Sequence, residues 1–206
     1  MGIINSNFSD GGRFPKQLLE ERIRNEGKVL PGDIIKVDGF LNHRVDTVLM
    51  KQLAQEFKNH FEETKPTVVM TVEASGIALA TATAMEMGLP LIFAKKAKSD
   101  NIEGGLITSE IFSYTYKKKV RLIVSSEWLK PTDRVLIIDD FMANGEAVRG
   151  LVNIVHAVGA ELVGIGIAVE KGFQGGGDML RDMHENLYSL AIIEGAEPGK
   201  IVFRQQ

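Results

Sequence analysis

The sequence predicts an α/β fold with a central, mostly parallel sheet flanked by helices. Uncharged apolar runs, such as residues 135–138, are typical of strands that are buried on both faces. Segments with helical apolar spacing separate these runs, and the alternation of strand and helix implies a parallel sheet. The 206 residues, of which 44% are hydrophobic, fit one domain with a substantial core.

The N-terminal part of the chain is expected to be a tail followed by helices. Residues 1–13 are polar and aperiodic, so we expect a flexible tail. Residues 14–26 fit a charged amphipathic helix, and residues 29–43 read as a strand and a loop. A second helix begins near Asp46, and its core-facing residues recur at helical spacing: Leu49, Met50, Leu53, Phe57 and Phe61.

The remaining elements alternate between strand and helix. Residues 67–72 are a β-branched run, residues 76–87 an alanine-rich helix and residues 91–94 a strand. After them we expect strands at 111–116, 120–124, 135–138, 162–169, 188–193 and 201–203, with helices at 148–158 and 175–186.

Composition excludes several classes of protein. The formal charge is −3, from 24 basic and 27 acidic residues, which gives no sign of a nucleic-acid or anionic-membrane surface. Cysteine is absent, which rules out disulfides and thiolate chemistry. No apolar run approaches the length of about 20 residues that a membrane span needs, and no signal peptide is apparent. We therefore expect a cytoplasmic protein.

The first candidate site is an acidic pair at the end of an apolar run. Asp139 and Asp140 follow Val-Leu-Ile-Ile, and ligands of parallel sheets bind at the carboxyl ends of strands. A small loop follows and opens a helix: Ala143, Asn144, Gly145, Glu146 and Ala147. Carboxylates accept hydrogen bonds from sugar hydroxyls, and the free N–H groups of a helix start bind phosphate. Taken alone, the pair is equally compatible with a plain strand end and an ordinary turn.

A second turn has the same shape. Glu73, Ala74, Ser75 and Gly76 lie between a strand and a helix, in the manner of an anion-binding turn. Taken alone, Ala-Ser-Gly before a helix is more often simple capping. When this turn is considered together with the acidic pair and its loop, anion binding is favoured over simple capping.

A third feature is a polar segment of about two dozen residues between strands, much longer than the usual connection of about 4–6 residues. It contains Lys95, Lys96 and Lys98, and later Tyr114 in a hydroxyl-rich stretch. We expect a flexible loop that closes over substrate, with lysines available to a pyrophosphate group. The alternative is an ordinary solvated charge run.

Residues 131–147 resemble the phosphoribosyl diphosphate-binding motif of type I phosphoribosyltransferases. Most members have Thr or Ser in the phosphate loop where this chain has Ala-Asn-Gly-Glu-Ala, so the backbone cradle rather than those hydroxyls is expected to bind. The resemblance implies the type I phosphoribosyltransferase fold, with residues 14–206 as one domain. It also implies a small hood, built from about residues 28–45 and the C-terminal segment.

The resemblance assigns roles to the candidate residues. Asp139 and Asp140 would be catalytic and hold the ribose, while residues 143–147 would bind its 5′-phosphate. Residues 73–76 would bind the pyrophosphate, and the family commonly has a non-proline cis peptide in that turn. Mg²⁺ would be bound mainly through the diphosphate of the substrate, without a dedicated protein metal site.

Two segments resemble the xanthine-specific members of the family, the N-terminal one being the most family-specific match. By position, Ile35, Asn42 and Lys171 would contact the base. An amide both donates and accepts at a base edge, and a lysine favours a 6-oxo purine over a 6-amino purine. The resemblance therefore implies purine salvage by a homodimer that transfers the phosphoribosyl group to N9 of xanthine.

Two alternatives remain open at the level of sequence. The base could instead be guanine, hypoxanthine or adenine. The chain could also be a non-catalytic regulator that senses phosphoribosyl diphosphate, although only 28 residues precede Val29, too few for an added DNA-binding module. We expect no nucleic-acid or membrane partner.

Overall fold

The computed structural model describes residues 15–32, 34–97, 105–113, 118–183, 185–197 and 200–205. Within them an eight-stranded sheet has the order β10-β9-β8-β7-β3-β4-β6-β5. Its strands are β3 (Val68–Val72), β4 (Leu91–Ala97), β5 (Leu106–Ser113), β6 (Lys118–Ser125), β7 (Arg134–Met142), β8 (Glu161–Lys171), β9 (Leu187–Glu197) and β10 (Lys200–Phe203). Strands β9, β8, β7, β3 and β4 are parallel to one another, while β10, β6 and β5 pair antiparallel. The predicted α/β fold with a mostly parallel sheet is confirmed.

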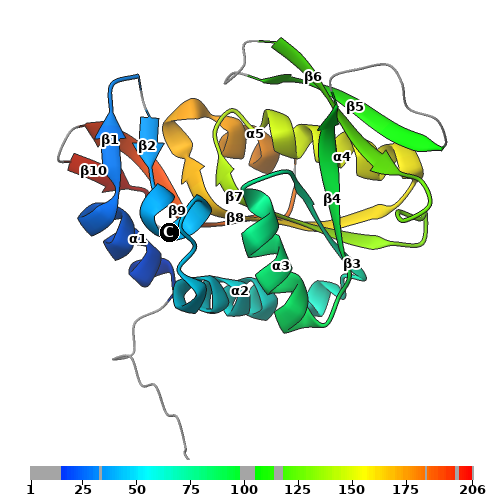
Figure 1. Ribbon diagram of the computed structural model, residues 1–206, viewed down its shortest axis with the longest axis horizontal. Helices are drawn as coiled ribbons and strands as arrows, with labels where there is room; N and C mark the ends of the chain where they lie inside the picture. Colours follow the sequence, from blue (N-terminus) through cyan, green and yellow to red (C-terminus); the bar gives the residue numbers. More distant parts are fainter. Residues whose placement is uncertain are drawn as a thin grey trace, which may run out of the picture.

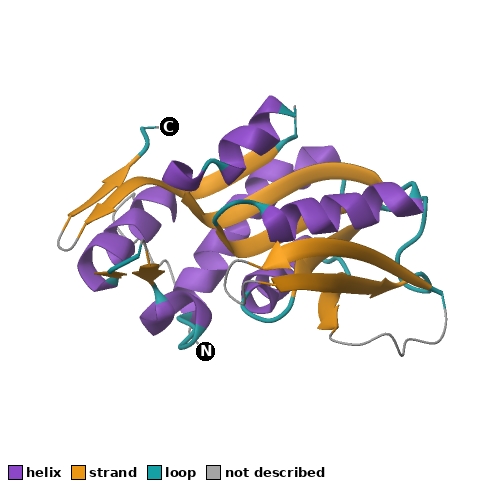
Figure 2. Cartoon of the chain, turned by 90° about the horizontal axis from the view of Figure 1, so that it is seen from above, coloured by secondary structure: helices purple, strands orange, loops and turns teal. Residues whose placement is uncertain are grey.

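Helices cover both faces of this sheet (Figure 1, Figure 2). They are α1 (Pro15–Glu26), α2 (Thr47–Phe61), α3 (Gly76–Met87), α4 (Glu146–Val158) and α5 (Gly176–Asp182). In Figure 1, α1, α2 and α3 lie below the sheet, whereas α4 and α5 lie above it. The predicted helix at 175–186 is shorter than expected, because α5 ends at Asp182. None of the described helices has the length and apolar character of a membrane span.

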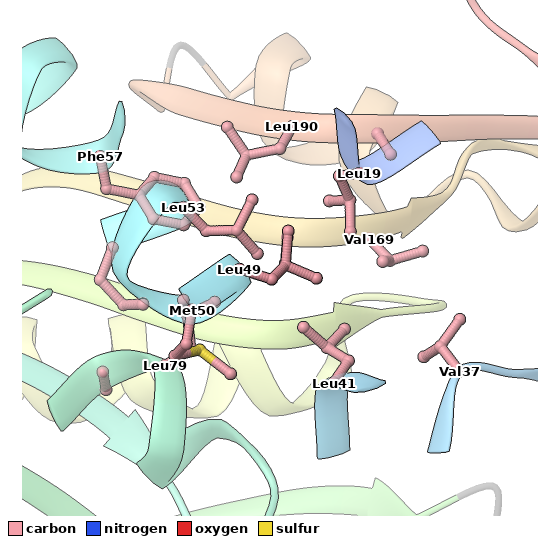
Figure 3. Packing of buried hydrophobic residues seen from close by; sticks show 14 of the residues in the cluster. Leu19, Val37, Leu41, Leu49, Met50, Leu53, Phe57, Leu79, Val169 and Leu190 are labelled. Carbon is pink, nitrogen blue, oxygen red and sulfur yellow. The ribbon is translucent and has the colours of Figure 1, made fainter. Parts of the chain in front are cut away.

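Two apolar clusters hold the layers together, one on each face of the sheet. Along β7, Leu136 and Ile138 belong to one cluster, and Val135 and Ile137 belong to the other. This alternation is expected of a strand buried on both faces, and it explains why the run carries no charge. Figure 3 shows side chains of the first cluster, among them Leu53, Leu79, Val169 and Leu190, which come from α2, α3, β8 and β9.

The N-terminal segment differs from the predicted single strand and loop. It forms a small antiparallel pair, β1 (Lys28–Leu30) with β2 (Ile34–Lys36), followed by a π-helical segment, η1 (Asp38–Asn42). Gly32 reverses the chain between the strands with φ of 83°, in the left-handed region that glycine tolerates. In Figure 1 this pair lies at the opposite end of the molecule from β5 and β6.

The expected long polar loop contains more regular structure than predicted. Strand β4 continues to Ala97 rather than ending at Ala94, and β5 begins at Leu106 rather than at 111. Strands β5 and β6 pair along their length, from Leu106↔Ser125 to Ser113↔Lys118. They pack on α4, where a Cβ on Gly150 would come within 2.5 Å of Ile111 Cγ2. Two predicted loop residues, Lys98 and Tyr114, lie outside the described residues.

Candidate active site

The acidic pair lies on β7, beside β3, at the point in the sheet where the order of the strands along the chain reverses. Strand β3 pairs with β7 from Val68↔Val135 to Met70↔Ile137, whereas β8 continues along β7 as far as Met142. Strand β3 continues for only two residues beyond Met70, to Val72, so the acidic pair lies beside the carboxyl end of β3 and the turn that follows it. The prediction that the strand ends at the acids was wrong by a few residues, because pairing with β8 extends it. Asp139 and Asp140 are only 4% and 2% exposed.

Both oxygens of Asp140 accept a hydrogen bond from a side chain. Ser75 Oγ donates to Asp140 Oδ1 over 2.9 Å, and Asn42 Nδ2 donates to Asp140 Oδ2 over 2.9 Å. The backbone N–H of Asp140 in turn donates to Asp139 Oδ1 over 3.0 Å. Three distant segments of the chain therefore meet at one carboxylate.

Asp139 faces the start of α3 at very close range. A Cβ on Gly76 would lie 2.1 Å from Asp139 Oδ1 and 2.4 Å from Thr71 Oγ1, so any larger residue would displace the carboxyl group. Among the described residues, the Thr71 hydroxyl is buried without a hydrogen-bond partner. Burial, and then the charge of Asp140, raise the pKa of the Asp139 carboxyl well above its ordinary value, with the charge of Lys96 acting in the opposite direction.

The turn after β3 contains the expected unusual peptide. The bond between Glu73 and Ala74 is cis, in the turn for which the resemblance implied one. Glu73 Oε1 accepts the backbone N–H of Lys96 over 2.7 Å, which ties this turn to β4. Ser75 and Ala74 are exposed, and Gly76 begins α3.

The loop after β7 is pressed against α5. Gly145 has φ of 77° and precedes α4, and no described side chain caps the N–H groups that follow. A Cβ on Gly176 would lie 2.4 Å from Ala143 O and 2.6 Å from Gly145 N, so the two backbones touch. An uncapped helix start next to small residues, here Ala143, Asn144 and Ala147, suits a phosphate.

Glu146 does not direct its carboxylate into this loop. Its Oε2 accepts the backbone N–H of Phe112 over 3.3 Å, and its Oε1 pairs with Arg149 at 3.0 Å. The side chain thus connects the loop to β5. The negative charge is held away from the place where a phosphate would bind.

The two described lysines of β4 lie on opposite faces, as neighbouring strand residues do. Lys96 is near the acidic pair, since its charge acts on Asp139. Lys95 lines a separate hollow of about 500 Å³ together with Phe93, Ile123 and Trp128. The structure therefore separates two residues that the sequence grouped together.

Two of the three predicted base-binding residues, Asn42 and Lys171, lie beside the end of β7. Lys171 ends β8 with its Nζ 5.5 Å from the ring centre of Phe141, and Asn42 reaches Asp140. Ile35 is buried in β2, in the same apolar cluster as Val169 and Ile193. Lys171 and Asn42 thus lie next to consecutive residues of β7, whereas Ile35 contributes mainly to packing.

Sequence reasoning missed a buried ion pair behind Lys171. Glu170 is fully buried and accepts two hydrogen bonds from Arg181, at 2.9 and 2.7 Å. Ser189 also donates its hydroxyl to Glu170. A Cβ on Gly177 would lie 1.9 Å from Glu170 Oε1, so α5 packs directly on this carboxylate. The available signal was an acidic residue within the apolar run of β8.

Metal-binding capacity in the described part of the chain is limited. No group of three or more His, Asp or Glu side chains is close enough there to hold an ion. At the end of β7, Asp139 and Asp140 supply carboxylate oxygens, too few to enclose an ion by themselves. This donor set fits an ion that a phosphorylated substrate brings with it, because Mg²⁺ often takes most of its ligands from water and substrate phosphates.

Comparison with known proteins agrees with this geometry. The family model for the phosphoribosyl transferase domain matches residues 42–179. The chain is 51% identical over 190 residues to xanthine phosphoribosyltransferase of Lachnoclostridium phytofermentans, covering 91% of this chain and 98% of that protein. It is 44% identical over 190 residues to xanthine phosphoribosyltransferase of Bacillus cereus, covering 92% and 96%.

Solved structures support the fold. Adenine phosphoribosyltransferase of Giardia lamblia, complexed with 9-deazaadenine, has a TM-score of 0.73 at 20% identity, covering 86% of this chain and 98% of that one. The enzyme of Saccharomyces cerevisiae has a TM-score of 0.71 at 19% identity, covering 85% and 98%. With the family match spanning well over half of its length, the chain belongs to the phosphoribosyl transferase domain family.

Proposed function

We propose that this protein transfers the phosphoribosyl group of 5-phosphoribosyl 1-diphosphate to N9 of xanthine, giving xanthosine 5′-phosphate and pyrophosphate. The observation that carries the proposal is the buried Asp139–Asp140 pair between two turns suited to anions. The high identity to xanthine phosphoribosyltransferases over most of the chain supports the choice of base. Such a reaction serves purine salvage.

In the proposed mechanism, the acidic pair acts on the ribose. The bond from the anomeric carbon to the diphosphate breaks, and its electrons leave with pyrophosphate. A bond from that carbon to N9 forms, and the proton of N9 passes to water. Positive charge develops on the ribose after the first bond begins to break and before the second has formed. Asp139 and Asp140 accept hydrogen bonds from the ribose hydroxyls and stabilise that charge electrostatically. A positive charge close to a carboxyl group favours its ionised form. The charge that develops on the ribose therefore lowers the pKa of Asp139, whereas burial and the charge of Asp140 raise it.

The two turns bind the anionic ends of the substrate. Backbone N–H groups of residues 143–147 and of the start of α4 hold the 5′-phosphate. The turn of residues 73–76 binds the diphosphate, and Lys96 contributes positive charge on the same side. Mg²⁺ carried by the diphosphate of the substrate would supply charge neutralisation there.

The base is selected by donors and acceptors near β8. Lys171 donates to the O6 atom of an oxopurine, and Asn42 donates to or accepts from the base edge. A 6-amino group would meet the ammonium group of Lys171 donor to donor, which disfavours adenine. Ile35 forms part of the apolar wall on the hood side.

A panel of four purine bases tests this proposal. Pyrophosphate release is measured with phosphoribosyl diphosphate, Mg²⁺ and xanthine, guanine, hypoxanthine or adenine. We expect the highest kcat/KM with xanthine and no turnover with adenine. Lys171→Met should lower kcat/KM for xanthine by about tenfold or more, as expected for loss of a charged hydrogen bond. Faster turnover of another base would contradict the choice of xanthine as substrate. Absence of turnover with all four bases would contradict the proposed transferase activity.

We also infer that residues 14–206 form one domain, with a hood from residues 28–45 and the C-terminal segment. Support comes from the packing of β1 on β9 and of α1 on β9 and β10. Homodimer formation is supported by exposed Phe93 and Trp128, at 40% and 67% exposure, around the hollow that includes Lys95. Sedimentation equilibrium should give twice the chain mass, and Trp128→Asp should shift it toward the monomer. A monomeric wild-type protein would contradict this part.

A further inference from the structure

Asn42 covers the carboxylate that the ribose needs. Its Nδ2 donates to Asp140 Oδ2 over 2.9 Å, across a separation of 98 residues in the sequence. Ser75 occupies the other oxygen at 2.9 Å. Each oxygen of a carboxylate can accept a further hydrogen bond, but Asp140 is only 2% exposed, so a ribose hydroxyl reaches it only after a side chain that covers it, such as Asn42, moves.

The backbone that carries Asn42 is anchored, but its side chain is not fully enclosed. Phe40 and Leu41 of the same η1 segment are completely buried, which fixes the segment on the core. Asn42 itself is half-buried. Rotation of the side chain is therefore the smaller change, compared with movement of the whole hood.

The same amide is also expected to meet the base. Phe141 packs against the apolar cluster that contains Phe40 and Leu41, the neighbours of Asn42, and Lys171 Nζ lies 5.5 Å from the Phe141 ring. An amide that turned away from Asp140 would therefore lie on the same side as Lys171, where the base is proposed to bind. The carboxylate of Asp140 in the empty site and the purine in the filled site thus compete for the side-chain amide of Asn42.

We propose that Asn42 is a coupling residue that exchanges Asp140 for the base when the ribose binds. This inference rests on the proposed function of the site. In the empty protein the amide satisfies the buried carboxylate. Ribose hydroxyls replace it on Asp140, and the released amide then binds the purine. Binding of phosphoribosyl diphosphate thereby strengthens binding of the base, and the coupling is reciprocal.

The proposal predicts effects of opposite sign on the two substrates. Asn42→Ala removes the group that competes with the ribose, so phosphoribosyl diphosphate should bind the free protein more tightly by about tenfold or more, as expected for one hydrogen bond to a charged group. The same change should raise the KM for xanthine by about tenfold or more. A general structural defect would weaken binding of both substrates.

Calorimetric titration of phosphoribosyl diphosphate with Mg²⁺ into the base-free protein makes the test. His43→Ala, at the exposed neighbouring position, serves as the matched control and should bind like wild type. If Asn42→Ala does not fold, Asn42→Ser gives the same prediction, since its shorter side chain does not reach Asp140. Tighter binding of phosphoribosyl diphosphate together with a raised KM for xanthine supports the proposal.

The failure outcomes are distinct. Unchanged or weaker binding of phosphoribosyl diphosphate by Asn42→Ala, with normal binding by wild type, overturns the coupling role alone. Absence of binding by wild type overturns the proposed function, and the coupling role with it. An unchanged KM for xanthine overturns the transfer of the amide to the base.

Discussion

Asp139 carries a carboxyl group that folding places in an unfavourable environment. It is buried next to a second carboxyl group, and both causes raise its pKa. A raised pKa means that the folded protein holds the proton more tightly than the unfolded chain does. The stabilisation that the proton gives is therefore complete at low pH and is lost as the pH rises through the pKa of the folded state.

The first prediction is that Asp139→Asn stabilises the protein while it impairs turnover. Asn carries no charge, so the melting temperature should rise by about 2–4 °C at pH 8, a common gain when a functional-site strain is removed. The gain should be smaller at pH 5, where the wild-type carboxyl holds its proton more often. Differential scanning calorimetry at both pH values measures this, with Asp182→Asn on the surface as control. An equal gain at both pH values would exclude the titration of Asp139 as the cause.

The second prediction separates the two lysines of β4. Lys96 acts on the acidic pair, whereas Lys95 lines the hollow with Phe93 and Trp128. Lys96→Ala should lower kcat/KM for phosphoribosyl diphosphate by about tenfold or more, since it removes charge from the side of the departing group. Lys95→Ala should lower kcat/KM clearly less than Lys96→Ala does, when the protein concentration is high enough to keep the protein dimeric. Steady-state kinetics of the two variants measures this difference. A larger loss of kcat/KM in Lys95→Ala than in Lys96→Ala would contradict the placement of Lys96 beside the acidic pair.

At the scale of elements, α5 links the phosphate loop to the end of β8. Gly176 touches the backbone of the loop, and Gly177 touches Glu170. Arg181 of α5 binds Glu170 and Asp178, and Asp178 binds Arg204 near the C-terminus. A short helix thus holds two parts of the site in fixed relative positions.

The third prediction concerns this ion pair. Arg181→Ala leaves the fully buried Glu170 without its cation, so the free energy of unfolding in urea should fall by about 3 kcal/mol. Arg149→Ala removes an exposed pair with Glu146 and should cost about 1 kcal/mol or less. The double change Glu170→Gln with Arg181→Met should recover part of the loss. A cost for Arg181→Ala no larger than for Arg149→Ala would show that the buried pair is not required for stability.

Some elements could be predicted from sequence and others could not, for physical reasons. Strand β7 is buried on both faces, so its uninterrupted apolar run identified it. Strands β5 and β6 instead alternate inward residues such as Ile111 and Leu122 with charged ones such as Glu110 and Arg121, which pair across the strands. The sequence predicted strands at 120–124 and from residue 111, but residues 106–110, which include Thr108, Ser109 and Glu110, were assigned to the polar loop. The short strands β1 and β2 were missed as a pair because three residues each give little periodic signal.

At the scale of the whole molecule, the order of strands assembles the site. Placing β3 beside β7 brings Ser75 to Asp140, and the N-terminal segment brings Asn42 to the same carboxylate. The motifs identified Ser75 and Asp140 from the sequence, because each lies where a strand ends or a helix begins, whereas Asn42 was indicated only by the resemblance to the family. The direction of individual side chains was not predictable, since it depends on neighbours far away in the chain. Glu146 turning to Phe112, and Lys95 turning away from the acids, are the clearest examples.

The central claim is that the acidic pair stabilises the ribose during transfer. The most direct test is turnover of the double variant Asp139→Asn with Asp140→Asn, measured as pyrophosphate release from phosphoribosyl diphosphate and xanthine. Both side chains keep their size, and the calorimetric melting temperature confirms that the protein is folded. We predict a fall in kcat of about 100-fold or more, the scale expected when preorganised electrostatic groups are removed. A folded double variant with near-normal turnover would contradict the account.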